Sequence, residues 1–272
     1  MKEGTTKAGF KRGSDEIKKL VEADLNDYKK KKSFANIASL LNDADVSTQV
    51  KTIKAITDSY SSYSEQIDKI TDIMSRSFIR NQKLIAITII TELSPIYPDY
   101  AFPKLAKIIS TQSDLIEAIS GALKNLWKEK EPELIKNIQA FWDLKTDKNL
   151  KLAAILSIDS ANIEDSEVLL DFLSNFIDES SMDVKYEVAL KIKELYIKEP
   201  YITESEMRKW LKESMSKNAA QTIILAFKEI SKRKDSFLLD RTCLILENWQ
   251  RNETEIIRNT GAKILSSLQE KL

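Results

Sequence analysis

Apolar residues recur along most of this chain at every third or fourth position, which is the spacing of one face of an α-helix. In the segment that follows Asp183, four of them stand at i, i+4, i+8 and i+11: Val184, Val188, Ile192 and Leu195. An apolar face of this width can pack against two neighbouring helices at once. Charged residues such as Lys191 stand mostly elsewhere and are expected to stay in solvent. No stretch alternates apolar and polar residues over a useful length, so the pattern predicts helices and no sheet.

The predicted helices repeat in pairs. Trp142, Phe176 and Trp210 stand 34 residues apart, and Trp249 follows 39 residues later. A period of this length is typical of stacked helix pairs, each of which contacts its neighbours. We expect an N-terminal helix over 14–30 and then seven pairs. First helices are predicted at 33–42, 64–77, 100–110, 132–143, 165–178, 203–214 and 235–249. Second helices are predicted at 46–60, 80–94, 114–130, 148–160, 183–199, 217–232 and 253–271.

Composition supports this organisation. The 272 residues include only five glycines, and 31% of them are charged, mostly lysine and glutamate, which favour helices. All five prolines stand at predicted helix boundaries, where proline interrupts a helix least: Pro95, Pro98, Pro103, Pro132 and Pro200. We therefore predict an all-α protein in which residues 1–13 are a flexible basic tail and residues 14–272 are a single helical-repeat domain.

Several classes of chemistry are excluded by residue types that the chain lacks or barely uses. It has no histidine, which excludes His-based nucleophile systems and most catalytic zinc sites. The single cysteine, Cys243, lies in an apolar run and fits a buried side chain in a reducing compartment. There is no apolar run of transmembrane length and no apolar signal segment. We expect a cytoplasmic protein with no metal, no small-molecule cofactor and no membrane partner.

A basic residue followed three or four positions later by alanine recurs on the predicted second helices. The five pairs are Lys51 and Ala55, Lys83 and Ala86, Lys151 and Ala154, Lys185 and Ala189, and Arg258 and Ala262. This pattern resembles the HEAT repeat of the armadillo-type superfamily over about residues 33–270. The resemblance implies a right-handed α-α superhelix of about seven helix pairs after the N-terminal helix, with the second helices on its concave face.

A narrower resemblance links residues 131–156, and more weakly 184–200, to the HEAT-like DNA alkylation repair glycosylases. Those enzymes hold a damaged duplex on a basic concave face and use a carboxylate beside tryptophans, with an arginine just before paired alanines. Through the EPEL and AAIL motifs, these three positions fall on Glu117, Ser113 and Leu152. Only the acid survives, so the resemblance implies an incomplete site. Glu117 would be catalytic only if the chain acts like a glycosylase.

The basic column of second-helix residues is the candidate binding site: Lys51, Lys83, Lys151, Lys185 and Arg258. These residues could bind phosphates or an acidic peptide. Alternatively, each could pair with a carboxylate of a neighbouring repeat, and Asp147 and Asp183 are placed to do so. We favour the second interpretation. The aromatic residues of the repeat could stack nucleic-acid bases, but a recurring phase favours a recurring packing role.

Charge bears on the choice of partner. Lysines and arginines number 42, as do aspartates and glutamates, so no overall field attracts a polyanion. Residues 159–183 hold eight carboxylates and no basic residue, which either remain in solvent or attract a basic partner. We predict a non-enzymatic HEAT-repeat scaffold that binds a protein partner along its concave face. The alternative is a relative of the alkylation repair glycosylases that binds duplex DNA and lacks the full catalytic site.

Overall fold

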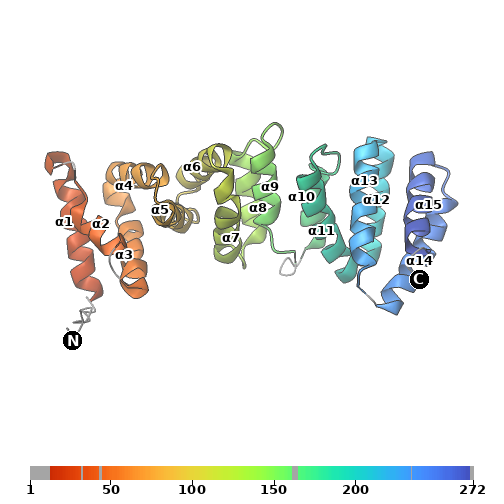
Figure 1. The fold of residues 1–272 in the computed structure, drawn as a ribbon, viewed down its shortest axis with the longest axis horizontal. Coiled ribbons are helices and arrows are strands. Elements are labelled where there is room, and N and C mark those ends of the chain that lie inside the picture. Colours follow the sequence, from red (N-terminus) through yellow and green to blue (C-terminus); the bar gives the residue numbers. More distant parts are fainter. Residues whose placement is uncertain (1–12, 32, 43–44, 161–164, 234, 270–272) are drawn as a thin grey trace, which may run out of the picture. The chain divides into compact units, whose positions relative to one another are not determined.

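The computed structural model describes residues 13–31, 33–42, 45–160, 165–233 and 235–269 (Figure 1). The predicted N-terminal tail therefore lies outside the described residues except for Gly13. Within the described ranges the chain forms fifteen α-helices, one 3-10 turn and no strand. The all-α prediction is confirmed, and none of the described helices has the length and apolarity needed to cross a membrane.

Every predicted helix is present, with ends within four residues of the prediction. The helix bounds are α1 Ser14–Lys31, α2 Ala35–Asn42, α3 Val46–Asp58, α4 Tyr60–Ser75, α5 Arg80–Leu93, α6 Pro98–Thr111, α7 Ile116–Leu126, α8 Glu131–Phe141, α9 Lys148–Leu156, α10 Ser166–Ser174, α11 Met182–Lys198, α12 Pro200–Ser214, α13 Lys217–Ile230, α14 Ser236–Gln250 and α15 Glu255–Gln269. The 3-10 turn η1, Ser113–Leu115, precedes α7 where the sequence predicted one continuous helix.

Helix starts follow the local capping residues. Asp45, Asp147 and Asp165 stand immediately before α3, α9 and α10, and each accepts a hydrogen bond from a backbone N–H of the first turn. Pro132 and Pro200 lie in the first turns of α8 and α12, where their missing N–H groups would have no helical partner. Local hydrogen bonding therefore sets the starts of α3, α9 and α10, whereas α4, α5 and α11 begin without a side-chain cap. Pro103, predicted at a helix boundary, lies inside α6.

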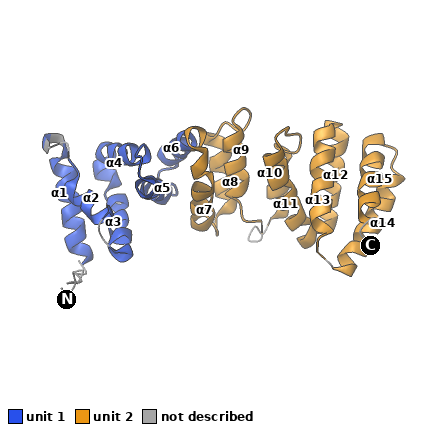
Figure 2. Ribbon diagram, in the orientation of Figure 1, with its two compact units in different colours: residues 1–108 blue, residues 109–272 orange. Residues whose placement is uncertain are grey.

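The chain divides into two compact units, residues 1–108 and 109–272 (Figure 2). A single domain over 14–272 stays a prediction. In unit 1, the fully buried Ile17, Val21 and Leu25 form the core face of α1, which packs against α2, α3 and α4. Asp24 accepts hydrogen bonds from Asn36 Nδ2 at 2.7 Å and from the backbone N–H of Ile37 at 2.9 Å. These bonds tie α1 to α2.

In unit 2 the second helices of successive pairs pack against one another in chain order: α7 on α9, α9 on α11, α11 on α13 and α13 on α15. Small residues permit this close packing. Ala153, Ala189 and Ala219 are fully buried, and Ser120 Oγ of α7 donates to the backbone oxygen of Ala153 in α9 at 3.0 Å. The second helices of this unit therefore form one layer.

The aromatic residues that mark the repeat are buried. Trp142, Phe176, Trp210 and Trp249 are each at most 4% exposed. Trp249 Nε1 donates to Glu204 Oε1 at 2.6 Å, which satisfies the indole N–H inside the core. The packing role of this column is confirmed, and its rings offer no free face on which a base could stack.

Two helical glycines of unit 2 provide a matched test of this packing. A Cβ at Gly261 of α15 would lie 2.8 Å from Trp249 Cβ, whereas one at Gly121 of α7 would meet nothing within 4 Å. Alanine favours a helix over glycine by roughly 0.5–1 kcal/mol, and overpacking a core costs about 1–3 kcal/mol. We expect Gly121→Ala to raise the unfolding temperature and Gly261→Ala to lower it. Thermal unfolding followed by circular dichroism tests both, and stabilisation by both would contradict the close approach at Gly261.

Candidate functional site

All five residues of the basic column lie on second helices, as predicted. Lys51 and Lys83 belong to α3 and α5 in unit 1, and Lys151, Lys185 and Arg258 belong to α9, α11 and α15 in unit 2. Their surroundings differ. Lys51 and Lys83 are half-buried, and Arg258 is exposed and donates to the backbone oxygen of Asn252 at 3.2 Å. Lys151 of α9 and Lys185 of α11 instead contact polar side chains of the next repeat.

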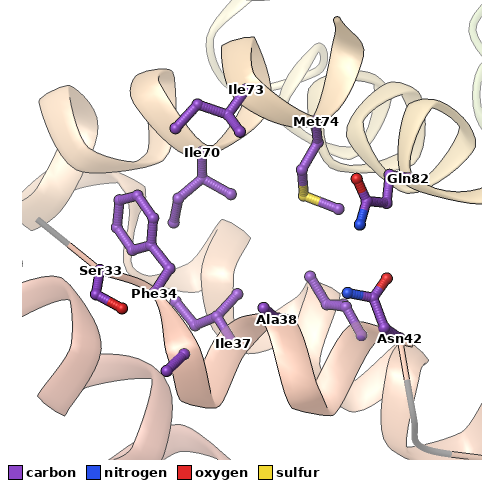
Figure 3. Close-up of a pocket in the computed structure, with 11 residues that line it drawn as sticks. Ser33, Phe34, Ile37, Ala38, Asn42, Ile70, Ile73, Met74 and Gln82 are labelled. Carbon is purple, nitrogen blue, oxygen red and sulfur yellow. The ribbon is translucent and has the colours of Figure 1, made fainter. Parts of the chain in front are cut away.

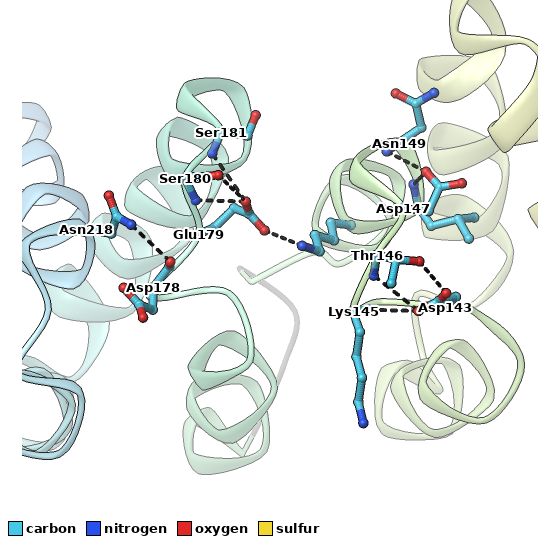
Figure 4. A network of polar contacts seen from close by, with 12 residues as sticks. Asp143, Lys145, Thr146, Asp147, Asn149, Asp178, Glu179, Ser180, Ser181 and Asn218 are labelled. Carbon is cyan, nitrogen blue, oxygen red and sulfur yellow. Dashed lines mark hydrogen bonds and ion pairs between the residues drawn. The ribbon is translucent and has the colours of Figure 1, made fainter.

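Lys151 forms an ion pair with Glu179, which lies in the turn before α11. The two side chains are only 13% and 14% exposed. Glu179 also accepts from the backbone N–H groups of Ser180 at 2.8 Å and Ser181 at 3.2 Å (Figure 4). Burial by itself would raise the pKa of Glu179, but the hydrogen bonds from Lys151, Ser181 and Ser180 outweigh it and lower the pKa to about 2. This pair connects α9 to the next repeat.

Lys185 is 3% exposed, and its Nζ donates to Asn218 Oδ1 at 2.9 Å and to Gln221 Oε1 at 2.6 Å. Both acceptors belong to α13, so Lys185 connects α11 to the following second helix. Lys151 and Lys185 therefore already hold internal partners. Lys151 matches the ladder interpretation, in which each cation pairs with a carboxylate of a neighbouring repeat, whereas Lys185 contacts amide oxygens of the neighbouring repeat instead.

The partners proposed for this ladder, Asp147 and Asp183, are wrong. Asp147 instead caps α9, accepting from the backbone N–H groups of Asn149 at 2.8 Å and Leu150 at 3.1 Å (Figure 4). Asp183 pairs with Lys148 at 2.6 Å on the surface. Asp147 immediately precedes α9 and is held by the free N–H groups of that helix, which leaves it turned away from the lysine one turn later. Asp183, in contrast, lies within the first turn of α11.

Sequence reasoning missed a second group of buried charges in unit 2, around Lys191 and Glu131. Lys191 is 7% exposed and donates to the backbone oxygen of Ile158 at 2.7 Å, which corrects its expected exposure to solvent. Burial lowers the pKa of Lys191 and raises the pKa of Glu131, whose Oε1 accepts from the backbone N–H of Asp159 at 2.8 Å. The helical period contained a signal, because Lys191 stands at i+7 from Val184 and so lies within the apolar stripe.

At least four hollows lie among the described residues. Two of them, on α10, α12 and the start of α15, are lined mainly by polar and charged side chains, and the other two present more apolar surface. The smaller, in unit 1, has a volume of about 240 Å³ and lies among α2, α4 and α5 (Figure 3). Phe34, Ile70 and Ile73 line one end, and the amides of Asn42 and Gln82 face each other near Met74 at the other. The described lining residues include no charged group, so this pocket can contact an apolar group but offers no ionised side chain for catalysis or for binding an ion.

The larger hollow is a groove of about 630 Å³ in unit 2, formed by α7, α9 and α11 and the turn before α7. Because α7 and α11 both pack against α9, the groove crosses three consecutive second helices. Its described lining residues are Ser113, Ile116, Glu117, Leu152, Leu156, Met182, Asp183, Tyr186 and Glu187. We call this surface the α7–α9–α11 groove.

Helical periodicity assembles the α7–α9–α11 groove. Leu152 and Leu156 are four residues apart on α9, as are Met182 and Tyr186 on α11, so each pair lies on one face of its helix. Met182 is 51% exposed and Tyr186 is 40% exposed, so both side chains are accessible to a partner. The groove therefore offers an apolar surface to a partner.

Carboxylates flank this apolar surface, and the described lining includes no lysine or arginine. Glu117 of α7 stands on one side of α9, and Asp183 and Glu187 of α11 stand on the other. Burial raises the pKa of Glu187, with nearby Glu194 adding to the rise and Lys191 opposing it. A carboxylate that is partly removed from water is stabilised by a cation and destabilised by an anion.

The groove gathers the three positions to which the glycosylase resemblance points: Ser113, Glu117 and Leu152. It thus unites them in space, but at these positions it has Ser113 and Leu152 in place of the tryptophan and the arginine that this resemblance requires. No group of acidic or cysteine side chains within the described part of the chain could hold a metal ion. Comparison with protein-family models and with curated protein sequences gives no match to this chain.

Proposed function

We propose that this chain is a non-enzymatic, cytoplasmic interaction scaffold of the HEAT-repeat type, with a right-handed superhelical stack of helix pairs. In this proposal the α7–α9–α11 groove binds a protein partner. The packing of the second helices of unit 2 in chain order supports the repeat architecture. The observation that carries the function is the groove lining, which combines exposed apolar side chains with carboxylates.

The lining favours a protein over duplex DNA. DNA binding depends on lysine and arginine side chains that neutralise phosphates. The described lining of the groove provides only acidic and uncharged residues, and Lys151 and Lys185 are engaged with Glu179, Asn218 and Gln221. Apolar side chains such as Tyr186 suit the apolar anchors of a polypeptide instead.

Selection from a random peptide library on the purified full-length chain tests this function. We expect the selected peptides to bind wild type and to lose at least about tenfold in affinity, roughly 1.4 kcal/mol, on Tyr186→Ser. Tyr201→Ser is the matched control, because Tyr201 is 69% exposed on α12 outside the groove. Peptides unaffected by Tyr186→Ser would contradict the groove as the binding site.

A duplex DNA titration over a salt series decides the alternative function. We expect no saturable binding at physiological salt. Saturable binding that weakens steeply with salt would overturn the scaffold proposal. Release of a base from DNA containing 7-methylguanine, lost in Glu117→Gln, would further assign a glycosylase activity.

A further inference from the structure

The charges around the α7–α9–α11 groove restrict the chemistry of its partner, provided that the proposed function holds. Glu117 and Glu187 are on opposite sides of Leu152 and Leu156, and neither forms an ion pair within the part of the chain that the structure describes. Asp183 is paired with Lys148, but its side chain is 65% exposed and that of Lys148 is 53% exposed. An occupant of the groove would thus meet apolar surface in the middle and negative charge on both sides.

The backbone of the groove limits the conformation of the occupant. An extended peptide gains affinity by adding a strand to a sheet edge, and the described residues include no sheet. The walls are helices, in which the N–H groups beyond the first turn and the C=O groups before the last turn are already bonded within each helix. An extended occupant would find few main-chain partners there. A helical occupant satisfies its own backbone and presents side chains alone.

The width of the groove is compatible with such an occupant. Adjacent helices pack about 8–10 Å apart, so α7 and α11 are separated by roughly 16–20 Å across α9. A helix rises about 1.5 Å per residue, so three to four turns would cross this distance. Apolar residues of one helical face could then meet Leu152, Leu156 and Tyr186, while residues flanking that face reach the carboxylates.

We infer that the groove takes an amphipathic helix of the partner protein whose apolar face is flanked by lysine or arginine side chains. The apolar face lies over Leu152, Leu156 and Tyr186. The flanking cations approach Glu117 on α7 and Glu187 on α11, while Asp183 stays paired with Lys148 at the rim. Long basic side chains suit this position because their aliphatic stems cover apolar surface while their charged ends reach carboxylates.

Three synthetic helical peptides of equal length and identical apolar face test the inference. Their polar faces carry lysine and arginine, glutamine, or glutamate. We expect the basic peptide to bind the full-length chain about tenfold more tightly than the glutamine peptide, and the glutamate peptide most weakly. Fluorescence anisotropy at physiological salt measures the three affinities.

Two double variants that remove the same charge show whether the preference for the basic peptide arises in the groove. Glu117→Gln with Glu187→Gln should reduce the advantage of the basic peptide to about twofold or less. Glu129→Gln with Glu133→Gln removes the same charge from exposed positions outside the groove and should preserve the advantage. Thermal unfolding of all variants verifies that each is folded.

The failure of the inference differs from the failure of the proposed function. If the glutamine peptide binds as tightly as the basic one, and Tyr186→Ser weakens both, the groove binds proteins but the basic preference is wrong. If both charge-variant pairs weaken the basic peptide equally, its preference reflects net charge and the inference is again wrong. If no peptide binds in a Tyr186-dependent manner, both the inference and the proposed function are wrong.

Discussion

Changing Lys151 and Lys185 together to glutamate is expected to lower the unfolding temperature of the full-length chain by at least about 10 °C. Lys151 is paired with Glu179 where both side chains are largely buried, so glutamate at 151 would place two carboxylates together. Removing one partner of a buried pair costs roughly 3–5 kcal/mol, and each kcal/mol shifts the transition of a domain of this size by about 2–4 °C. Thermal unfolding followed by circular dichroism measures the shift.

The two single variants should differ in severity. Lys185 faces the side-chain amides of Asn218 and Gln221, which can rotate to offer their NH₂ groups to a carboxylate. Lys185→Glu should therefore cost less than Lys151→Glu. Lys128→Glu with Lys136→Glu makes the same change of charge at exposed positions of unit 2 and should leave the transition nearly unchanged. A wild-type transition for the Lys151 and Lys185 double variant would restore the basic column as a candidate binding site.

Acid should weaken unit 2 through Glu179, and Glu179→Gln should remove that dependence. The pKa of this carboxyl is about 2 in the folded chain and 4.5 in its ordinary state. Because the folded value is the lower one, the ionised side chain stabilises the fold above pH 4.5, and this contribution disappears as the pH falls toward 2. Near neutral pH, ionised Glu179 contributes roughly 2–3 kcal/mol to the free energy of unfolding. This figure follows from the shift in its pKa, discounted because the side chain keeps some contact with solvent.

Urea unfolding at a series of pH values from 7 to 3 measures this contribution. Wild type should lose stability progressively below pH 4.5, and Glu179→Gln should start lower and show a shallower decline. Glu213→Gln, at an exposed position of α12, should follow the wild-type curve. Parallel curves for wild type and Glu179→Gln would show that the Lys151 ion pair contributes no pH-dependent stability.

The sequence by itself determined the helices and the broad limits on chemistry. Apolar spacing, capping aspartates and boundary prolines act within a few residues of one another, so the ends of α9 and α12 could be located without knowledge of the fold. The burial of Trp142 and Trp249 was also predictable, because a large aromatic residue at a constant phase of a repeat needs a constant packing partner. The absence of histidine likewise needed no structure to exclude the nucleophile systems that depend on histidine.

Only the tertiary structure decided which charged residues meet. Lys151 and Glu179 are 28 residues apart, and several carboxylates closer in sequence were equally plausible partners. Lys191 bonds to Ile158 O because the end of the preceding second helix comes within reach, which an amphipathic pattern along α11 does not specify. The α7–α9–α11 groove arises in the same way. A helical period states which residues share a face, but the packing of three helices determines whether that face is covered or left open for a partner.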